Sequence, residues 1–206
     1  MCEGAWYASG HLEALGVSRG RTVLVYGASG AIGTAAVQLA KHRGAEVTAV
    51  VATPHLDLVR SLGADHVADY TAEDFTRIPR RFAAVLDAVG KTTSFRCRRL
   101  LEPGGVFAAT DLGPWCQNPL LALWSTTTRS GRILFPLSTK AADVVGRLAG
   151  LMEAGELRAV VDRRYPLATI VDAYRYVETG QKVGIVVVDV EARRELPNAG
   201  PLPASS

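Results

Sequence analysis

Three glycines near the start of the chain have the spacing of a phosphate-binding turn. Gly27, Gly30 and Gly33 recur at every third position. A continuous apolar run, Thr22 to Tyr26, precedes them, and an amphipathic run, Thr34 to Lys41, follows. A strand, a glycine turn and a helix in this order bring unpaired N–H groups of the helix N-terminus to the turn, where they bind anions. The pattern predicts a site for the pyrophosphate of a dinucleotide.

Each glycine has an expected role. Gly27 lets the chain leave the strand in a tight turn, and Gly30 lets backbone N–H groups approach a phosphate. Gly33 lets the helix pack close to the sheet. The common G-x-G-x-x-G pattern becomes A-S-G-A-I-G here, and the alternative is a glycine-rich turn of another βα unit. The expected cofactor-binding residues of the turn are Gly27, Ala28, Ser29, Gly30, Ala31, Ile32 and Gly33.

The end of the second expected strand, 46–51, bears on the type of dinucleotide. An NAD site commonly places Asp or Glu about 20 residues past the glycines, against the ribose 2′-hydroxyl. This stretch carries no carboxylate before Asp57. Thr53 could donate a hydrogen bond to a 2′-phosphate, so the sequence favours NADP(H) over NAD(H). His55 is read either as a phosphate contact or as a solvent-exposed residue at a helix start.

Composition narrows the class of protein. The chain has 206 residues, 48% hydrophobic and 21% charged, with a net charge of only +3, so no nucleic-acid partner is predicted. Its three cysteines are far apart and fit neither a disulfide framework nor zinc-ligand spacing. We therefore expect a cytoplasmic protein without a metal. No signal peptide and no membrane-length apolar run is recognised, so no membrane partner is predicted.

Apolar runs and helical patterns alternate along the chain, which predicts an α/β fold: a Rossmann-type doubly wound parallel six-stranded sheet. The expected strands lie near 22–27, 46–51, 66–69, 83–88, 104–110 and 132–136, and the expected helices near 3–15, 31–43, 54–63, 72–77, 92–101 and 139–154. Capping boxes are expected at 71–74 and 169–172. The stretch 111–131 is read either as a functional loop or as a docked helix.

The expected division of the chain has four parts. Residues 1–20 form a leading linker helix, and 21–155 form the NAD(P)-binding domain. Residues 156–190 are a remnant of a second domain with a strong terminal strand. Residues 191–206 hold three prolines and are expected to be a disordered tail.

Several further motifs fall in the order of a known family. They read Gly27-Ala-Ser-Gly-Ala-Ile-Gly33, Gln38-Leu-Ala-Lys41, Leu58-Val-Arg-Ser-Leu-Gly-Ala-Asp65, His66-Val-Ala-Asp-Tyr70, Val85-Leu-Asp-Ala-Val-Gly90, Leu101-Glu-Pro-Gly-Gly105 and Tyr176-Val-Glu-Thr-Gly180. From about residue 4 to 190 the chain resembles the medium-chain dehydrogenase/reductase superfamily of zinc-type alcohol dehydrogenase-like proteins. Within it, the chain is most similar to the quinone-oxidoreductase-like branch.

The resemblance implies further cofactor contacts. Tyr70 would lie beside the adenosine phosphate end, and Ala88, Val89 and Gly90 near the nicotinamide ribose. Leu112 and Gly113 would approach the nicotinamide. No catalytic residue is identified, because in the zinc-free branch the cofactor performs the hydride chemistry and the protein orients it. Lys182 stands two residues before Gly184, where the family commonly has lysine after the glycine, so its cofactor contact is in doubt.

The resemblance also implies a missing domain, a subunit contact and a function. The family's N-terminal domain has no counterpart, and 160–190 resembles the segment that packs on it. The strand 132–136 resembles an edge that pairs subunits in a homodimer. The implied function is NADPH-dependent hydride transfer to a small-molecule substrate, a quinone or an enone or other carbonyl compound. The alternatives are a non-catalytic NADP(H)-binding fragment, or one subunit of a split enzyme.

Overall fold

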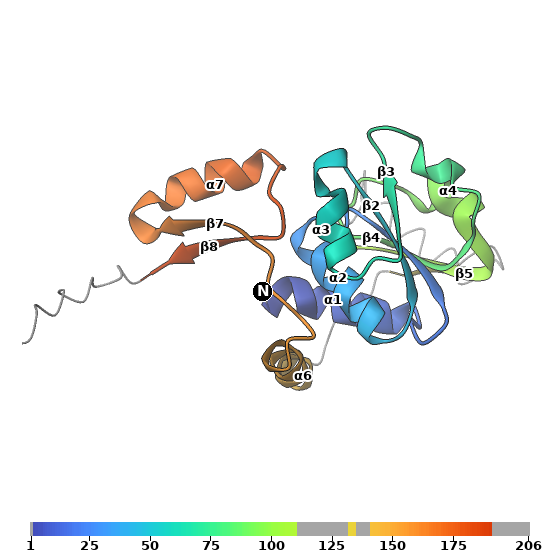
Figure 1. The fold of residues 1–206 in the computed structure, drawn as a ribbon, viewed down its shortest axis with the longest axis horizontal. Coiled ribbons are helices and arrows are strands. Elements are labelled where there is room, and N and C mark those ends of the chain that lie inside the picture. Colours follow the sequence, from blue (N-terminus) through green and yellow to red (C-terminus); the bar gives the residue numbers. More distant parts are fainter. Residues whose placement is uncertain (1, 111–131, 135–140, 191–206) are drawn as a thin grey trace, which may run out of the picture.

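A parallel six-stranded sheet with the order β3-β2-β1-β4-β5-β6 forms the body of the molecule (Figure 1). The computed structural model describes residues 2–110, 132–134 and 141–190. The strands are β1 (Thr22–Tyr26), β2 (Glu46–Val51), β3 (His66–Asp69), β4 (Phe82–Asp87), β5 (Leu101–Ala109) and β6 (Arg132–Leu134). The order and the parallel pairing confirm the predicted Rossmann-type fold.

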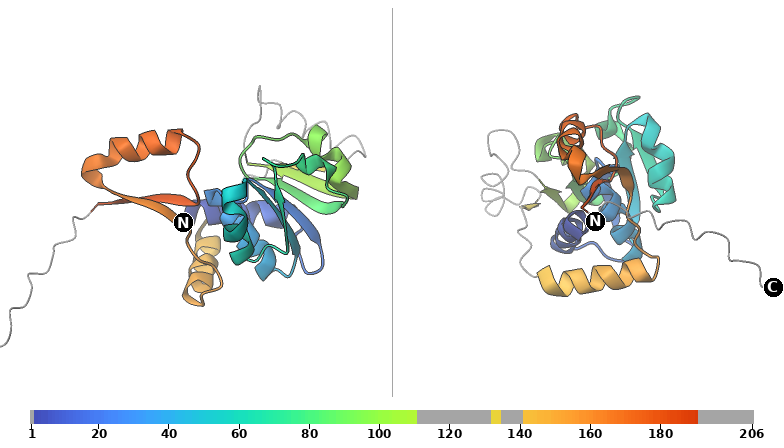
Figure 2. Two further views of the ribbon diagram at one scale, coloured as in Figure 1. Left: turned by 45° about the horizontal axis from the view of Figure 1, so that its top comes forward. Right: turned by 90° about the vertical axis from the view of Figure 1, so that its left-hand side faces the viewer.

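Helices and 3-10 turns connect these strands. The helices are α1 (Cys2–Ala14), α2 (Ala31–His42), α3 (Leu56–Ser61), α4 (Ser94–Cys97), α6 (Ala141–Glu153) and α7 (Ile170–Glu178), and the 3-10 turns are η1 (Thr53–His55), η2 (Phe75–Arg77), η3 (Arg98–Leu100) and η5 (Leu167–Thr169). α2 packs against α1, which lies beside α6 (Figure 2). None of the described helices is long and apolar enough to cross a bilayer.

The apolar run of β1 is continuous because both of its faces are buried. Val23 and Val25 pack into the core that the helices α1 and α2 also line. Leu24 points the other way, into a second core with Phe82 and Phe107. Side chains alternate across a strand, so a strand covered on both sides is apolar throughout. The strand predicted before the glycine turn is thus confirmed, and it lies inside the sheet between β2 and β4.

Two expected helices are shorter than predicted. The helix expected at 72–77 is only η2, and its cap is Asp74, whose carboxylate accepts a hydrogen bond from the Thr76 N–H at 3.1 Å. The capping box from Thr71 is therefore wrong. The helix expected at 92–101 ends early, because Leu101 already pairs with Phe82 in the sheet.

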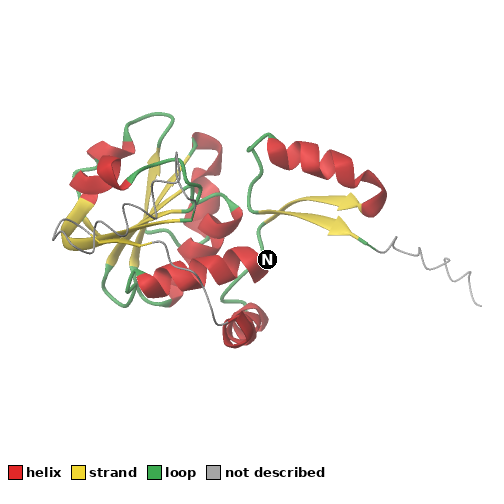
Figure 3. Ribbon diagram, turned by 180° about the vertical axis from the view of Figure 1, so that it is seen from behind, coloured by secondary structure: helices red, strands yellow, loops and turns green. Residues whose placement is uncertain are grey.

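A second, two-stranded parallel sheet follows α6. β7 (Val161–Pro166) pairs with β8 (Ile185–Asp189), and α7 crosses between them (Figure 3). The expected capping box of α7 is wrong, since the Thr169 hydroxyl donates to the Pro166 carbonyl at 3.2 Å instead. The β7–α7–β8 unit lies to one side of the main sheet. It touches the glycine turn through the Gly184 N–H, which donates to the Ser29 carbonyl at 2.7 Å.

Some predictions fall outside the described residues. They are Leu112 and Gly113, the choice between loop and docked helix for 111–131, the end of the strand expected at 132–136, and the tail 191–206.

Candidate functional site

The glycine turn leaves β1 by a conformation that only glycine adopts readily. Gly27 has φ +75°, in the left-handed region. A Cβ there would lie 2.6 Å and 2.7 Å from the two methyl carbons of Val89. The Gly27 and Ala28 N–H groups donate to the Val50 carbonyl at 3.1 and 3.3 Å. The turn is therefore held between the ends of β2 and β4.

Gly33 and Gly30 differ in what surrounds them. A Cβ on Gly33 would lie 2.2 Å from the Gly27 carbonyl oxygen, so α2 approaches the turn closely. A Cβ on Gly30 would find its nearest protein atom at 3.6 Å, and its φ of −77° is ordinary. The fold itself requires glycine at 27 and 33, whereas a Cβ on Gly30 would make only ordinary van der Waals contacts, with the Gly27 carbonyl oxygen and a Val89 methyl carbon at 3.6 and 3.9 Å.

The N-terminus of α2 opens at this turn. Gly30 is its N-cap, no side chain caps it, and its first turn holds no acidic residue. Ala31, Ile32 and Gly33 begin the helix, so their N–H groups and the helix dipole favour an anion. The donor set therefore fits a pyrophosphate. The site also lies at the carboxyl ends of the parallel strands, next to β1, where ligands of such sheets bind.

A buried carboxylate orders the residues after β4. Asp87 accepts hydrogen bonds from the N–H groups of Val89, Gly90 and Thr92 at 3.1, 2.9 and 2.8 Å. Burial raises the pKa of Asp87, while these N–H groups act in the opposite direction. The bonds fix Ala88, Val89 and Gly90 beside the glycine turn. The sequence placed Asp87 at the end of a strand, but this positioning role was missed.

A carboxylate of β3 lies beside the end of β2, and this neighbour was not predicted from the sequence. Thr53 donates its hydroxyl proton to the Asp69 carboxylate. Asp69 also accepts from the Thr71 N–H at 2.8 Å and the Thr71 hydroxyl at 2.5 Å. The bonds from Thr53 and then Thr71 lower the pKa of Asp69. The stretch after β2 itself carries no carboxylate before Asp57, as the sequence shows, but β3 brings the Asp69 carboxylate beside Thr53.

The remaining predicted residues of this edge lie close by. Tyr70 is 46% exposed, and its ring lies 6.0 Å from the Tyr26 ring. His55 ends η1 and precedes α3, with its N–H bonded to the Ala52 carbonyl at 2.9 Å. Among the described residues, the His55 imidazole takes part in no hydrogen bond or ion pair. The structure thus brings Thr53 and Tyr70 to one edge of the sheet and leaves the role of His55 open.

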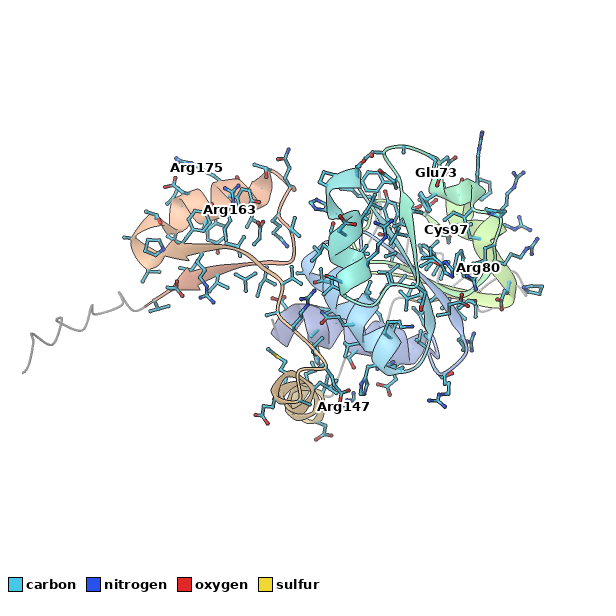
Figure 4. The ribbon with its side chains drawn as sticks, in the orientation of Figure 1. Glu73, Arg80, Cys97, Arg147, Arg163 and Arg175 are labelled. Atoms are coloured by element: carbon cyan, nitrogen blue, oxygen red, sulfur yellow. The ribbon has the colours of Figure 1, made fainter. Side chains whose placement is uncertain are left out.

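Other reactive side chains are engaged elsewhere. His11 is buried in α1 with its Nδ1 2.8 Å from the Tyr7 carbonyl, and burial lowers its pKa. Burial raises the pKa of Cys97 to about 11, so its thiol is unreactive at neutral pH. Figure 4 labels Cys97 within the sheet's second core. Neither residue belongs to the site described above.

Comparisons with known proteins give a consistent result. The family model described as "Zinc-binding dehydrogenase" matches residues 62–188, more than half of the chain. The 2-methylene-furan-3-one reductase of Solanum lycopersicum is 32% identical over 86% of this chain and 42% of its own length. The chloroplastic NADPH-dependent alkenal/one oxidoreductase of Arabidopsis thaliana is 33% identical over 83% of this chain and 41% of its own.

A solved structure shows the same arrangement. The quinone oxidoreductase from Coxiella burnetii superposes with a TM-score of 0.83 at 25% identity, covering 92% of this chain and 59% of that one. The chain therefore spans less than half the length of the two curated relatives that it matches.

The family description raises the question of zinc. In the described ranges, no three His, Cys, Asp or Glu side chains gather as metal ligands. Two of the histidines are paired instead, His42 with Glu156 and His66 with Glu46. The described residues do not fit a zinc site.

Proposed function

Because this chain belongs to the zinc-binding dehydrogenase family, we propose that its glycine turn binds NADP(H) and that the whole protein is an oxidoreductase. The proposed acceptor of the hydride is a quinone or an enone or other carbonyl compound. The relatives named as a furanone reductase and as an NADPH-dependent alkenal/one oxidoreductase support this substrate class.

The observation that carries the proposal is that the fold would tolerate a Cβ at Gly30 without a close contact. Gly27 and Gly33 are closely surrounded by protein, whereas a Cβ on Gly30 would meet nothing closer than 3.6 Å. Because the fold itself does not require glycine at this position, we attribute Gly30 to a ligand that approaches the backbone there. The neighbouring N–H groups of α2 supply the positive end of the helix for a pyrophosphate.

The other predicted residues would line the two ends of the dinucleotide. Thr53, His55 and Tyr70 would line the adenosine ribose end. Ala88, Val89 and Gly90, ordered by Asp87, would line the nicotinamide side. NADPH supplies a hydride when bound, and the residues of the chain orient it. The contacts of Leu112 and Gly113 remain predictions.

The test is the affinity of the chain for NADPH, before and after Gly30→Val. We expect wild type to bind NADPH and Gly30→Val to bind it at least about tenfold more weakly, because the new side chain occupies the space beside the phosphates. Isothermal titration calorimetry measures both. Gly150→Val in α6 is the control for the substitution itself, since a Cβ there meets nothing within 4 Å and the position lies outside the glycine turn. Equal affinities of wild type and Gly30→Val would refute the proposal.

Activity separates the proposed enzyme from the alternatives. NADPH oxidation by this chain with a benzoquinone or an enone, followed at 340 nm, supports the oxidoreductase. Binding without turnover favours a non-catalytic NADP(H)-binding fragment or one subunit of a split enzyme.

We also propose a homodimer through the edge strand β6. Among the described strands β6 has only β5 as a neighbour, which leaves its outer backbone groups free to pair with a second copy. Sedimentation velocity would show a dimer that Ile133→Pro converts to a monomer, and a monomeric wild type would contradict it. A missing N-terminal domain and a cytoplasmic location stay predictions.

A further inference from the structure

The end of β2 holds the position from which ribose specificity is set in this fold. An acidic residue about 20 positions after the glycines commonly binds the 2′-hydroxyl of NAD. Thr53 occupies that position here, 20 residues after Gly33 (53 − 33). Its hydroxyl proton is already donated to Asp69. The donor that a 2′-phosphate would need is therefore engaged by a carboxylate.

Asp69 reaches this position through the register of the sheet. Asp69 is the partner of Val51 in the parallel β2–β3 pair. The next residue, Tyr70, donates its N–H to the Val51 carbonyl at 3.1 Å. β2 and β3 thus end side by side, and the carboxylate of β3 lies where β2 itself has none.

Among the described residues, no positively charged side chain neutralises the charge of Asp69. Its side-chain partners are the hydroxyl groups of Thr53 and Thr71 and the Thr71 N–H. Within the described ranges no Lys, Arg or His pairs with it. Arg77 and Arg96, on neighbouring segments, lie 3.9 Å from Asp74 instead.

We propose that Asp69 is a specificity-determining residue that opposes the 2′-phosphate of NADPH and accepts a hydrogen bond from the 2′-hydroxyl of NADH. This inference rests on the proposed dinucleotide site and adds to it. A carboxylate and a phosphate at hydrogen-bonding separation from the same threonine repel each other, because both are negative. The chain therefore accepts NADH as well as NADPH, with weak discrimination between them.

The experiment compares the dissociation constants of NADPH and NADH for wild type and Asp69→Asn. Asparagine retains an acceptor oxygen for Thr53 and Thr71 but removes the charge. We expect Asp69→Asn to raise the ratio Kd(NADH)/Kd(NADPH) by at least about fivefold. Glu73→Gln is the matched control. It removes one negative charge four residues away on the same exposed loop (Figure 4), and we expect it to change the ratio by less than about twofold.

The outcomes distinguish the two proposals. If wild type binds neither dinucleotide, the proposed site fails and the inference with it. If wild type binds NADPH but Asp69→Asn behaves like Glu73→Gln, the site stands and the role of Asp69 is refuted.

Measuring the ratio Kd(NADH)/Kd(NADPH) of wild type at increasing NaCl concentration tests the proposal without a variant. Added NaCl screens charges at an exposed site. If Asp69 repels the 2′-phosphate, the ratio Kd(NADH)/Kd(NADPH) rises with salt. A ratio that falls with salt shows a net attraction for the 2′-phosphate and overturns the proposal.

Discussion

At Gly33 one added methyl group would meet the protein backbone directly. Its Cβ would lie 2.2 Å from the Gly27 carbonyl oxygen and 2.6 Å from the Ala28 Cα. Neither neighbour is the flexible end of a side chain, so relief requires α2 to move away from the turn. Gly30 lies three residues earlier in the same turn and has room for a methyl group. The two positions separate what the fold requires from what a ligand would require.

Gly33→Ala should therefore destabilise the protein by about 1–3 kcal/mol, as overpacking does elsewhere. Gly30→Ala should change the free energy of unfolding by less than about 0.5 kcal/mol, because its φ is ordinary and its Cβ would make no contact closer than 3.6 Å. Urea unfolding followed by circular dichroism measures both. A Gly33→Ala variant as stable as wild type would show that the turn and α2 are not closely packed.

The turn was predictable from sequence at this scale, because glycine spacing encodes local backbone geometry. The roles of Asp87 and Asp69 were not predicted from the sequence. The N–H groups that Asp87 binds lie only two to five residues after it, but the sequence does not show that its carboxylate turns toward them. Asp69 meets Thr53, in the turn after β2, only because β2 and β3 end side by side.

Among the elements, β2 is tied to its neighbours by a carboxylate at its start. Glu46 Oε2 lies 2.5 Å from Arg80 Nη2, and Glu46 Oε1 lies 2.8 Å from His66 Nε2. The hydrogen bond from Arg80, followed by that from His66, lowers the pKa of Glu46 from 4.5 to about 2. Glu46 thus links β2 to β3 and to the segment before β4, at the edge opposite the glycine turn.

This shift predicts a pH-dependent contribution of Glu46 to stability. The pKa is lower in the folded state, so the contribution is complete above pH 4.5 and is lost as pH falls toward about 2. The stability difference between wild type and Glu46→Gln should therefore shrink between pH 5 and pH 2. Urea unfolding at about four pH values across this range measures it. A difference that grows on acidification would contradict the assigned ion pairs.

The elements themselves were largely predictable, because buried strands and amphipathic helices carry their periods in the sequence. The short connections were not. Thr71 has the residue type of a helix cap, yet its hydroxyl donates to Asp69. Leu101 was expected to end a helix, yet it pairs with Phe82 in the sheet. Leu101 pairs across the sheet, whereas Thr71 is engaged by a carboxylate only two residues earlier, so in each case a specific partner outweighs the local helix preference.

At the scale of the molecule, the β7–α7–β8 unit reaches the proposed site through one glycine. Gly184 has φ +62°, and a Cβ there would lie 2.1 Å from the Val160 carbonyl. Its N–H donates to Ser29 within the glycine turn. The segment that the family resemblance assigned to a second domain is thus attached to the turn itself. The terminal strand was predicted from the sequence, but the contact between Gly184 and Ser29 was not.

The central claim is that a dinucleotide lies on the glycine turn, and NMR of the ¹⁵N-labelled chain tests it most directly. Titration with NADPH should shift the amide signals of Gly30 to Gly33 and of Val89 and Gly90 most strongly. The amides of α6, on the far side of α1, serve as the internal reference. The account predicts saturable shifts confined to the carboxyl edge of the sheet. Unchanged spectra, or shifts that leave Gly30 to Gly33 untouched, would contradict it.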